Sequence, residues 1–188
     1  DRDGEILLEV SDAVRESLIA NMDSDELVAA AGTLEADELA DLAPDLPDEV
    51  IQEVAQSLPL DEREQLRAAL SYKEGTVGAL MDFEFITVRE DVALEVVTRY
   101  LRRMDELPDH SDQLFVVDRA RRLCGALPIT RLIVSNLELE VAAVLVPEQV
   151  TLHPEDRAED AARAFERYDL VSAPVVDADG RLVGRVTV

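Results

Sequence analysis

The chain has 188 residues, of which 42 are acidic and 18 basic, so its net charge is −24. This balance argues against nucleic acid and anionic lipid surfaces as partners and favours cations. An apolar content of 47% can form a real core, but the longest apolar run is far too short to cross a membrane. The lone Cys124 lies in an apolar run, which indicates a buried hydrophobic side chain and not a nucleophile.

The acidic excess is concentrated in the first part of the chain. Residues 1–70 hold 20 acids and 4 bases, a net charge of −16, whereas residues 71–188 hold 22 and 14, a net charge of −8. Two interpretations follow from this composition: the acids bind cations, or they form a solvated surface that only confers solubility.

The first seventy residues predict short helices. Residues 1–21 have apolar side chains at helical spacing and are predicted to be helical. A twelve-residue period then begins, carried by Met22, Leu34, Leu46, Leu58 and Leu70. Each repeat fits one helix that opens with acidic residues able to cap its free N–H groups. Helices this short need neighbours, so residues 1–70 predict an all-α superhelical stack that buries the leucines and has an acid-lined edge.

Residues 71–81 form a joint, because Gly75 and Gly78 interrupt the helical pattern. Strands and helices alternate beyond it. We expect a strand at 85–88, a helix at 92–104, a polar loop at 106–113, a hairpin at 115–127 and a helix or turn at 130–137. Together these elements define a first unit over residues 82–145.

The same order of elements recurs over residues 146–188, with a strand at 150–152, a helix at 156–168 and a hairpin at 173–188. The two hairpins match at an offset of 59, as in Asp118 with Asp177 and Gly125 with Gly184. The preceding elements match at an offset of 64, so the first unit has five extra residues in its polar loop. The second unit lacks its closing helix, and we therefore expect the chain to be part of a longer protein.

This repeated strand–helix–strand–strand–helix unit, with its Val-Val-Asp and Gly-Arg-Leu-x-Gly segments, resembles the paired CBS (cystathionine β-synthase) module. The joint at 71–81 and the acidic helices before it resemble the MgtE family of magnesium channels, although Val77 stands where that family usually has alanine. Arg167-Tyr168-Asp169-Leu170 is similar to a segment of the family's second CBS unit. The resemblance covers essentially the whole chain.

The resemblance implies an α+β fold, in which an all-α superhelical N-terminal domain precedes a tandem CBS (βαββα) pair. It implies a homodimer whose C-terminal transmembrane domain, absent from this sequence, forms a Mg²⁺-conducting pore. This part would be soluble and lie at the cytoplasmic face of the cell membrane. Mg²⁺ ions bound between the N and CBS domains would hold the pore shut when the ion is abundant.

The resemblance also implies metal ligands: Glu38, Asp41, the backbone carbonyl of Ala79, Glu159 and Asp169. Glu38 and Asp41 are three residues apart, so one helical face holds both. The family more often has aspartate at the position of Glu38. Mg²⁺ needs few carboxylates, because it takes six oxygens and retains several waters. The alternative is that these residues are only helix-start acids and exposed helix residues.

A competing function is the binding of adenine nucleotides between the CBS copies. The ribose-binding pattern in such modules has a glycine, then Ser or Thr three residues on, then Asp three further. The first copy has Gly125, Pro128 and Arg131, and the second has Gly184 and Thr187 before the sequence ends. We therefore expect weak or no ATP binding.

An enzyme is not expected, because no catalytic constellation is present. His110 and His153 have no Ser or Cys partner at a recognisable spacing, and the sequence has no P-loop lysine.

Overall fold

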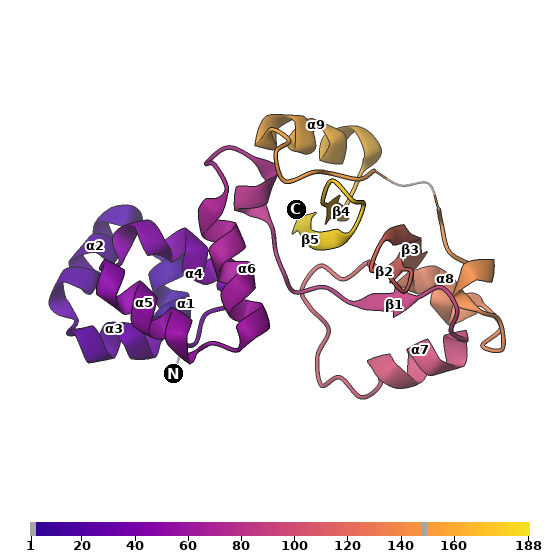
Figure 1. Ribbon diagram of the computed structural model, residues 1–188, viewed down its shortest axis with the longest axis horizontal. Helices are drawn as coiled ribbons and strands as arrows, with labels where there is room; N and C mark the ends of the chain where they lie inside the picture. The colour runs from indigo at the N-terminus through magenta and orange to yellow at the C-terminus, as the bar shows by residue number, and fades with distance from the viewer. Residues whose placement is uncertain (1–2, 148–149) are drawn as a thin grey trace. The chain divides into compact units, whose positions relative to one another are not determined.

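The computed structural model describes residues 3–147 and 150–188 (Figure 1), so residues 1–2 of the predicted helical segment 1–21 and residues 148–149 of the predicted second unit lie outside the described residues. The chain forms two compact units, the first ending at Tyr72 and the second beginning at Lys73. The described part of the first unit has helices and no strand, whereas the second combines both, so the predicted α+β class is confirmed. No helix in the described ranges has the length and apolar character needed to cross a membrane.

The first unit is a stack of short helices whose apolar sides meet. Its helices are α1 (Asp3–Glu9), α2 (Asp12–Asn21), α3 (Ser24–Ala31), α4 (Ala36–Leu42), the 3-10 helix η1 (Ala43–Asp45), α5 (Asp48–Ser57) and α6 (Leu60–Ser71). Helix α4 packs on α6, and α3 packs on α5. The largest fully buried side chains of this unit are Leu7, Leu39, Leu42, Val50, Val54 and Leu66.

The helical structure predicted over residues 1–21 is confirmed for the described residues, but it consists of two helices, because the chain breaks between α1 and α2. Ser11 has extended backbone angles, with φ −65° and ψ 152°, and begins the second helix. The break lets α1 bury Leu7, which is 2% exposed, while α2 has no fully buried residue. Tertiary burial of one short helix therefore overrides a continuous apolar pattern.

The twelve-residue period marks helix ends more than it marks the core. Leu34 and Leu46 are buried as predicted, but Met22 and Leu58 are half-buried and Leu70 is 46% exposed. Met22, Leu46 and Leu58 each follow directly after a helix as its C-cap. The prediction that stacking buries every repeat leucine is wrong, since Leu58 is only half-buried and Leu70, within α6, lies on an exposed side of its helix.

The second unit contains two copies of one hairpin. Its elements are η2 (Val77–Leu80), β1 (Thr87–Arg89), α7 (Leu94–Leu101), β2 (Gln113–Val117), β3 (Leu123–Pro128), α8 (Ile129–Val134), η3 (Val141–Ala143), α9 (Ala158–Tyr168), β4 (Ser172–Val176) and β5 (Leu182–Thr187). Strand β1 is parallel to β2, and β2 is antiparallel to β3. Strands β4 and β5 form a second, antiparallel sheet. Both hairpins shift register at equivalent places, after Val116 and after Val175.

Each copy adds its leading segment to the sheet of the other copy. Val146 pairs with Ala126 of β3, and Asp82 pairs with Arg185 of β5. These pairs obey the same offsets of 64 and 59 that the sequence shows. The glycines at 125 and 184 follow from this exchange. A Cβ at Gly125 would lie 2.4 Å from the Val146 carbonyl oxygen, and one at Gly184 would lie 2.7 Å from the Met81 sulfur.

The strand predicted at 150–152 is wrong and reduces to one bridge, where Leu152 lies parallel to Val175. Pro154, which has no N–H to donate, comes two residues later, and the chain turns there towards α9. The Asp156 carboxylate accepts a hydrogen bond from the His153 N–H at 2.8 Å and closes this turn. The first copy differs, since β1 pairs with β2 over three residues.

Candidate metal sites

Helix α4 places Glu38 and Asp41 one turn apart in the first unit. Glu38 is the third residue of the helix, and its Oε2 accepts a hydrogen bond from the Glu35 N–H at 2.9 Å. Glu38 thus contributes to capping its own helix, as the alternative interpretation expects, while an oxygen of the same carboxylate stays outside that bond. Asp41 is exposed near the end of the helix.

The Asp41 carboxyl is electrostatically perturbed. Displacement of water by the surrounding protein raises its pKa, the positive charge of Arg15 opposes this, and the negative charge of Glu38 adds to it. A cation near Glu38 and Asp41 would relieve the repulsion between the two carboxylates. The pair can therefore supply one or two oxygens to an ion that keeps most of its water.

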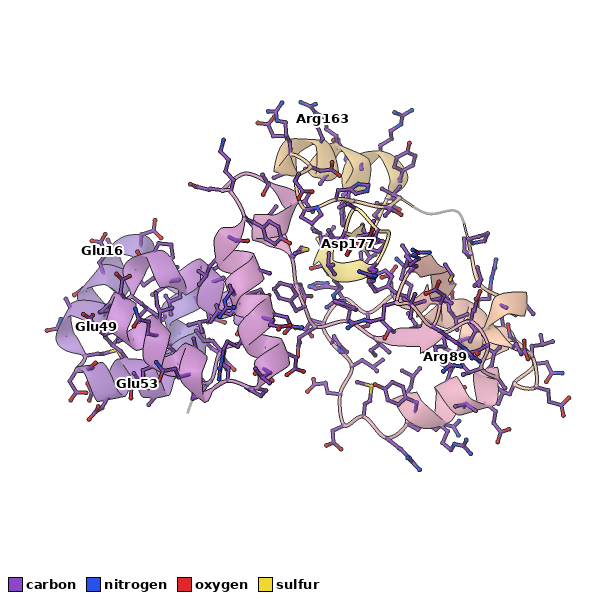
Figure 2. The ribbon with its side chains drawn as sticks, viewed as in Figure 1. Glu16, Glu49, Glu53, Arg89, Arg163 and Asp177 are labelled. Atoms are coloured by element: carbon purple, nitrogen blue, oxygen red, sulfur yellow. The ribbon has the colours of Figure 1, made fainter. Side chains whose placement is uncertain are left out.

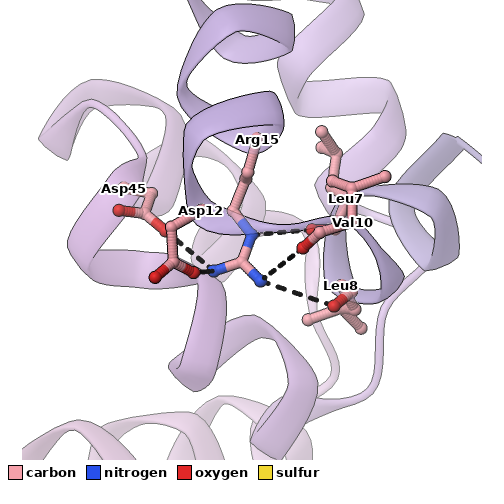
Figure 3. Close-up of polar contacts among 6 residues, drawn as sticks. All are labelled: Leu7, Leu8, Val10, Asp12, Arg15 and Asp45. Atoms are coloured by element: carbon pink, nitrogen blue, oxygen red, sulfur yellow. Dashed lines mark hydrogen bonds and ion pairs between the residues drawn. The ribbon is translucent and has the colours of Figure 1, made fainter.

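Arg15 of α2 organises the neighbourhood of this helix (Figure 3). Its Nε donates to the Leu7 carbonyl oxygen at 2.7 Å, and its Nη2 lies 3.4 and 3.5 Å from the carbonyl oxygens of Leu8 and Val10. Its Nη1 donates to Asp45 Oδ2 at 3.1 Å. Asp45 ends η1, which follows α4 directly, so Arg15 connects the end of α1 to the chain just beyond Asp41.

Ala79 lies in η2, a segment held firmly within the second unit. The N–H groups of Val77 and Gly78 donate to the carbonyls of Asp156 and Pro154, each at 2.8 Å. The Ala158 N–H donates to the Gly75 carbonyl at 2.9 Å. These bonds attach the joint to the start of α9, the helix that carries Glu159.

Glu159 and Asp169 lie at opposite ends of α9. Glu159 is in the first turn and forms an exposed ion pair with Arg157 at 2.6 Å. Asp169 is the C-cap in the left-handed conformation, with φ 51°. Ten residues of helix separate them, a rise of about 15 Å. One ion therefore cannot contact both carboxylates of the same chain, and the structure separates these two candidates.

Acidic side chains cover much of the first unit, and Figure 2 labels Glu16 of α2 with Glu49 and Glu53 of α5 as examples. No group of three or more His, Cys, Asp or Glu side chains that could hold a metal occurs within residues 3–147 and 150–188. The candidates are therefore partial sites, which suit a hydrated ion better than a dehydrated one.

Sequence reasoning missed two arginines that organise these regions. Arg185 is 4% exposed, and its guanidinium contacts Asp82 Oδ2 at 2.7 Å and donates to the Asp109 carbonyl oxygen at 2.8 Å. Nothing in the repeat signals this ion pair, because the equivalent residue of the first copy is Ala126. For Arg15 a signal existed: Arg63 follows it by 48 residues, which is four twelve-residue periods.

A cleft of about 290 Å³ lies between the two copies of the second unit. Gln113 and Ser172, equivalent residues at the offset of 59, contribute polar groups to its lining. The Gln113 amide lies 3.2 Å from the Ser172 hydroxyl, which donates to Asp112 Oδ1 at 2.5 Å. Pro128 also lines the cleft. These polar groups thus already have partners within the protein.

Comparison with known proteins identifies relatives of both units. The model of the MgtE intracellular N domain matches residues 1–75, and that of the CBS domain matches residues 141–188. The magnesium transporter MgtE of Thermus thermophilus is 38% identical over 126 residues, which are 67% of this chain and 28% of that protein. The chain thus spans well under a third of that relative.

Solved structures match along the entire chain. The cytosolic domain of the Mg²⁺ channel MgtE, crystallised in complex with ATP, is 31% identical with a TM-score of 0.87, covering 100% of this chain and 77% of that one. The soluble part of a magnesium transporter is 23% identical with a TM-score of 0.87, covering 100% and 75%, and shows the same fold.

Proposed function

Because this chain belongs to the MgtE family of magnesium transporters, we propose that it is the Mg²⁺-sensing regulatory region of such a transporter. The observation that supports this most is the similarity, over the whole chain, to the cytosolic domain of a Mg²⁺ channel. In this proposal the region lies at the cytoplasmic face of the membrane, acts as a homodimer and closes the pore of its own C-terminal transmembrane domain when Mg²⁺ is abundant.

Carboxylates that bind Mg²⁺ only in part, with water as the other ligands, can make the conformation depend on the ion. Carboxylates pushed together without an ion repel, at roughly 4 kcal/mol for a pair ~4 Å apart at an effective dielectric near 20. An ion that bridges the two carboxylates attracts both of them, and this attraction outweighs their mutual repulsion. Glu38, Asp41, Glu159, Asp169 and the Ala79 carbonyl are the ligands we propose, with water completing each shell. Ligand binding then selects a closed state over an open one.

Specific bridging, and not general neutralisation, is required. The Debye length is ~8 Å at physiological salt, so long-range repulsion among the 42 acidic residues is largely screened. We therefore expect Mg²⁺ at millimolar concentration to compact the 188-residue chain by bridging acids of the two units. Potassium chloride at equal ionic strength should not replace it.

Small-angle scattering tests this proposal. The radius of gyration should fall on addition of Mg²⁺ to the wild-type chain, and Glu38→Ala with Asp41→Ala should reduce the change. Glu49→Ala with Glu53→Ala removes the same charge from exposed positions of α5 and should leave the change intact. Glu159→Ala with Asp169→Ala should weaken the response within the CBS pair. A radius that Mg²⁺ leaves unchanged, or that potassium chloride changes equally, would mean that the acids are only a solvated surface.

A second candidate function is binding of an adenine nucleotide, favoured by the ATP bound to the similar cytosolic domain and by the cleft between the two copies. The residues of this chain argue for weak binding. Pro128 offers no hydroxyl, and Arg131 donates to the Val144 carbonyl oxygen at 3.0 Å where the pattern has an aspartate. Calorimetry with ATP should show weak or no heat, whereas tight stoichiometric binding would favour the nucleotide function.

A further inference from the structure

Two arginines of the first unit perform the same structural task at repeat-related positions. Arg15 contacts the carbonyl oxygens of the residues eight, seven and five positions before it, at the end of α1. Arg63 donates to the carbonyl oxygens eight, seven and five positions before it, at 2.7, 2.9 and 3.0 Å, at the end of α5. Each guanidinium satisfies carbonyls that a helix end leaves without partners.

Only one of the two also faces carboxylates. Arg15 Nη1 lies 3.1 Å from Asp45 Oδ2 and 3.6 Å from Asp12 Oδ1 (Figure 3). Arg63 forms no ion pair with any residue in the described part of the chain. Arg15 is therefore a fixed cation among acids, whereas Arg63 is a helix cap alone.

The positive charge of Arg15 cannot move away easily when an ion arrives. Its side chain is 17% exposed, and three backbone carbonyls hold the guanidinium in place. Its bond to Asp45, the last residue of the 3-10 helix that directly follows α4, fixes this charge at the end of the helix that carries Asp41.

We propose that Arg15 is a positioning residue that weakens Mg²⁺ binding at the carboxylates of Glu38 and Asp41. The reason is electrostatic, since a positive charge fixed at the end of α4 repels a divalent ion bound by the carboxylates of that helix. The result is an affinity set low enough to respond to an abundant ion instead of remaining saturated. This inference rests on the proposed sensing function.

Arg63 supplies a matched control within the chain. Arg15→Gln and Arg63→Gln each remove one positive charge and the same set of helix-cap bonds, but only Arg15 also pairs with a carboxylate just beyond the end of α4. Amide chemical shifts of α4 in the labelled 188-residue chain, followed during a Mg²⁺ titration, give the dissociation constant. Arg15→Gln should lower it about three- to tenfold, the effect of one charge at intermediate range on a divalent ion. Arg63→Gln should leave it unchanged.

Two more variants separate charge from fold. Arg15→Lys keeps the charge and should retain an affinity close to that of the wild type. Arg15→Met, neutral but with a long apolar stem, replaces Arg15→Gln if the latter does not fold. A response of α4 to Mg²⁺ with equal constants in the Arg15→Gln and Arg63→Gln proteins would overturn this inference alone. No response in the wild type or in any variant would overturn both this inference and the sensing role of α4.

Discussion

The two copies in the second unit share a backbone plan but differ in how each holds the leading segment of the other. In the first copy, β3 receives Val146 through backbone bonds, with the small Ala126 opposite. In the second, β5 receives Asp82 through backbone bonds and a largely buried Arg185–Asp82 ion pair. A repeat thus sets backbone geometry, while the asymmetry that attaches the joint to one copy lies in single side chains.

Removal of this ion pair should give the largest effect. Arg185→Ala leaves the Asp82 carboxylate, whose side chain is 23% exposed, without its partner and leaves the Asp109 carbonyl without a donor. We expect a loss of roughly 3 kcal/mol in the free energy of unfolding of the second unit, measured by chemical denaturation. Arg181→Ala, at an exposed position near the start of β5, should cost less than about 0.5 kcal/mol. Equal losses in the two variants would show that the ion pair does not hold the segment.

The repeated glycines should respond unequally to alanine. At Gly125 the new methyl group would meet the backbone oxygen of Val146, which cannot move without breaking the backbone hydrogen bonds between Val146 and Ala126. The φ of 155° at Gly125 also disfavours a side chain. At Gly184 it would meet the Met81 side chain, which can change rotamer. Thermal denaturation should show a loss of about 2–3 kcal/mol for Gly125→Ala and about 1 kcal/mol for Gly184→Ala. The reverse order would contradict the role of Val146.

The smallest effect concerns a turn that only the first copy stabilises with arginine. A hydrogen bond from Arg89 is the main cause that lowers the pKa of Asp91 to about 2, and Arg119 contributes in the same direction. Because the folded pKa is depressed from 3.8, the associated stability is present above about pH 4 and is lost as the pH falls towards 2.

Arg89→Ala should raise the pKa of Asp91 towards its ordinary value and flatten this part of the stability profile, as side-chain NMR titration and acid denaturation would show. In the second copy the equivalent positions, at the offset of 64, are His153 and Glu155. Glu155→Gln therefore serves as the control and should leave the profile unchanged. An Asp91 pKa that stays near 2 without Arg89 would contradict the assignment.

Much of this protein is determined by its sequence alone. The two classes of unit follow from the change of apolar period at the joint, and the repeat predicts equivalent hairpins because local turn and strand preferences recur with it. The acidic first turns of α3 to α6 were equally readable, since short helices need partners for their free N–H groups. Glu38 and Asp41 share one helix for the same local reason.

Tertiary structure decided what depends on distant partners. Asp82 meets Arg185 across 103 residues, Leu7 is buried only because the chain breaks at Ser11, and the expected strand at 150–152 ends at the turn before α9. The charge that Arg15 places beside the end of α4 likewise depends on a contact 30 residues away. Burial and hydrogen bonding between distant segments outweigh local preferences, and no local pattern in the sequence indicates which segments meet. The candidate carboxylates could therefore be found from the sequence, whereas the positive charge near them could be found only from the fold.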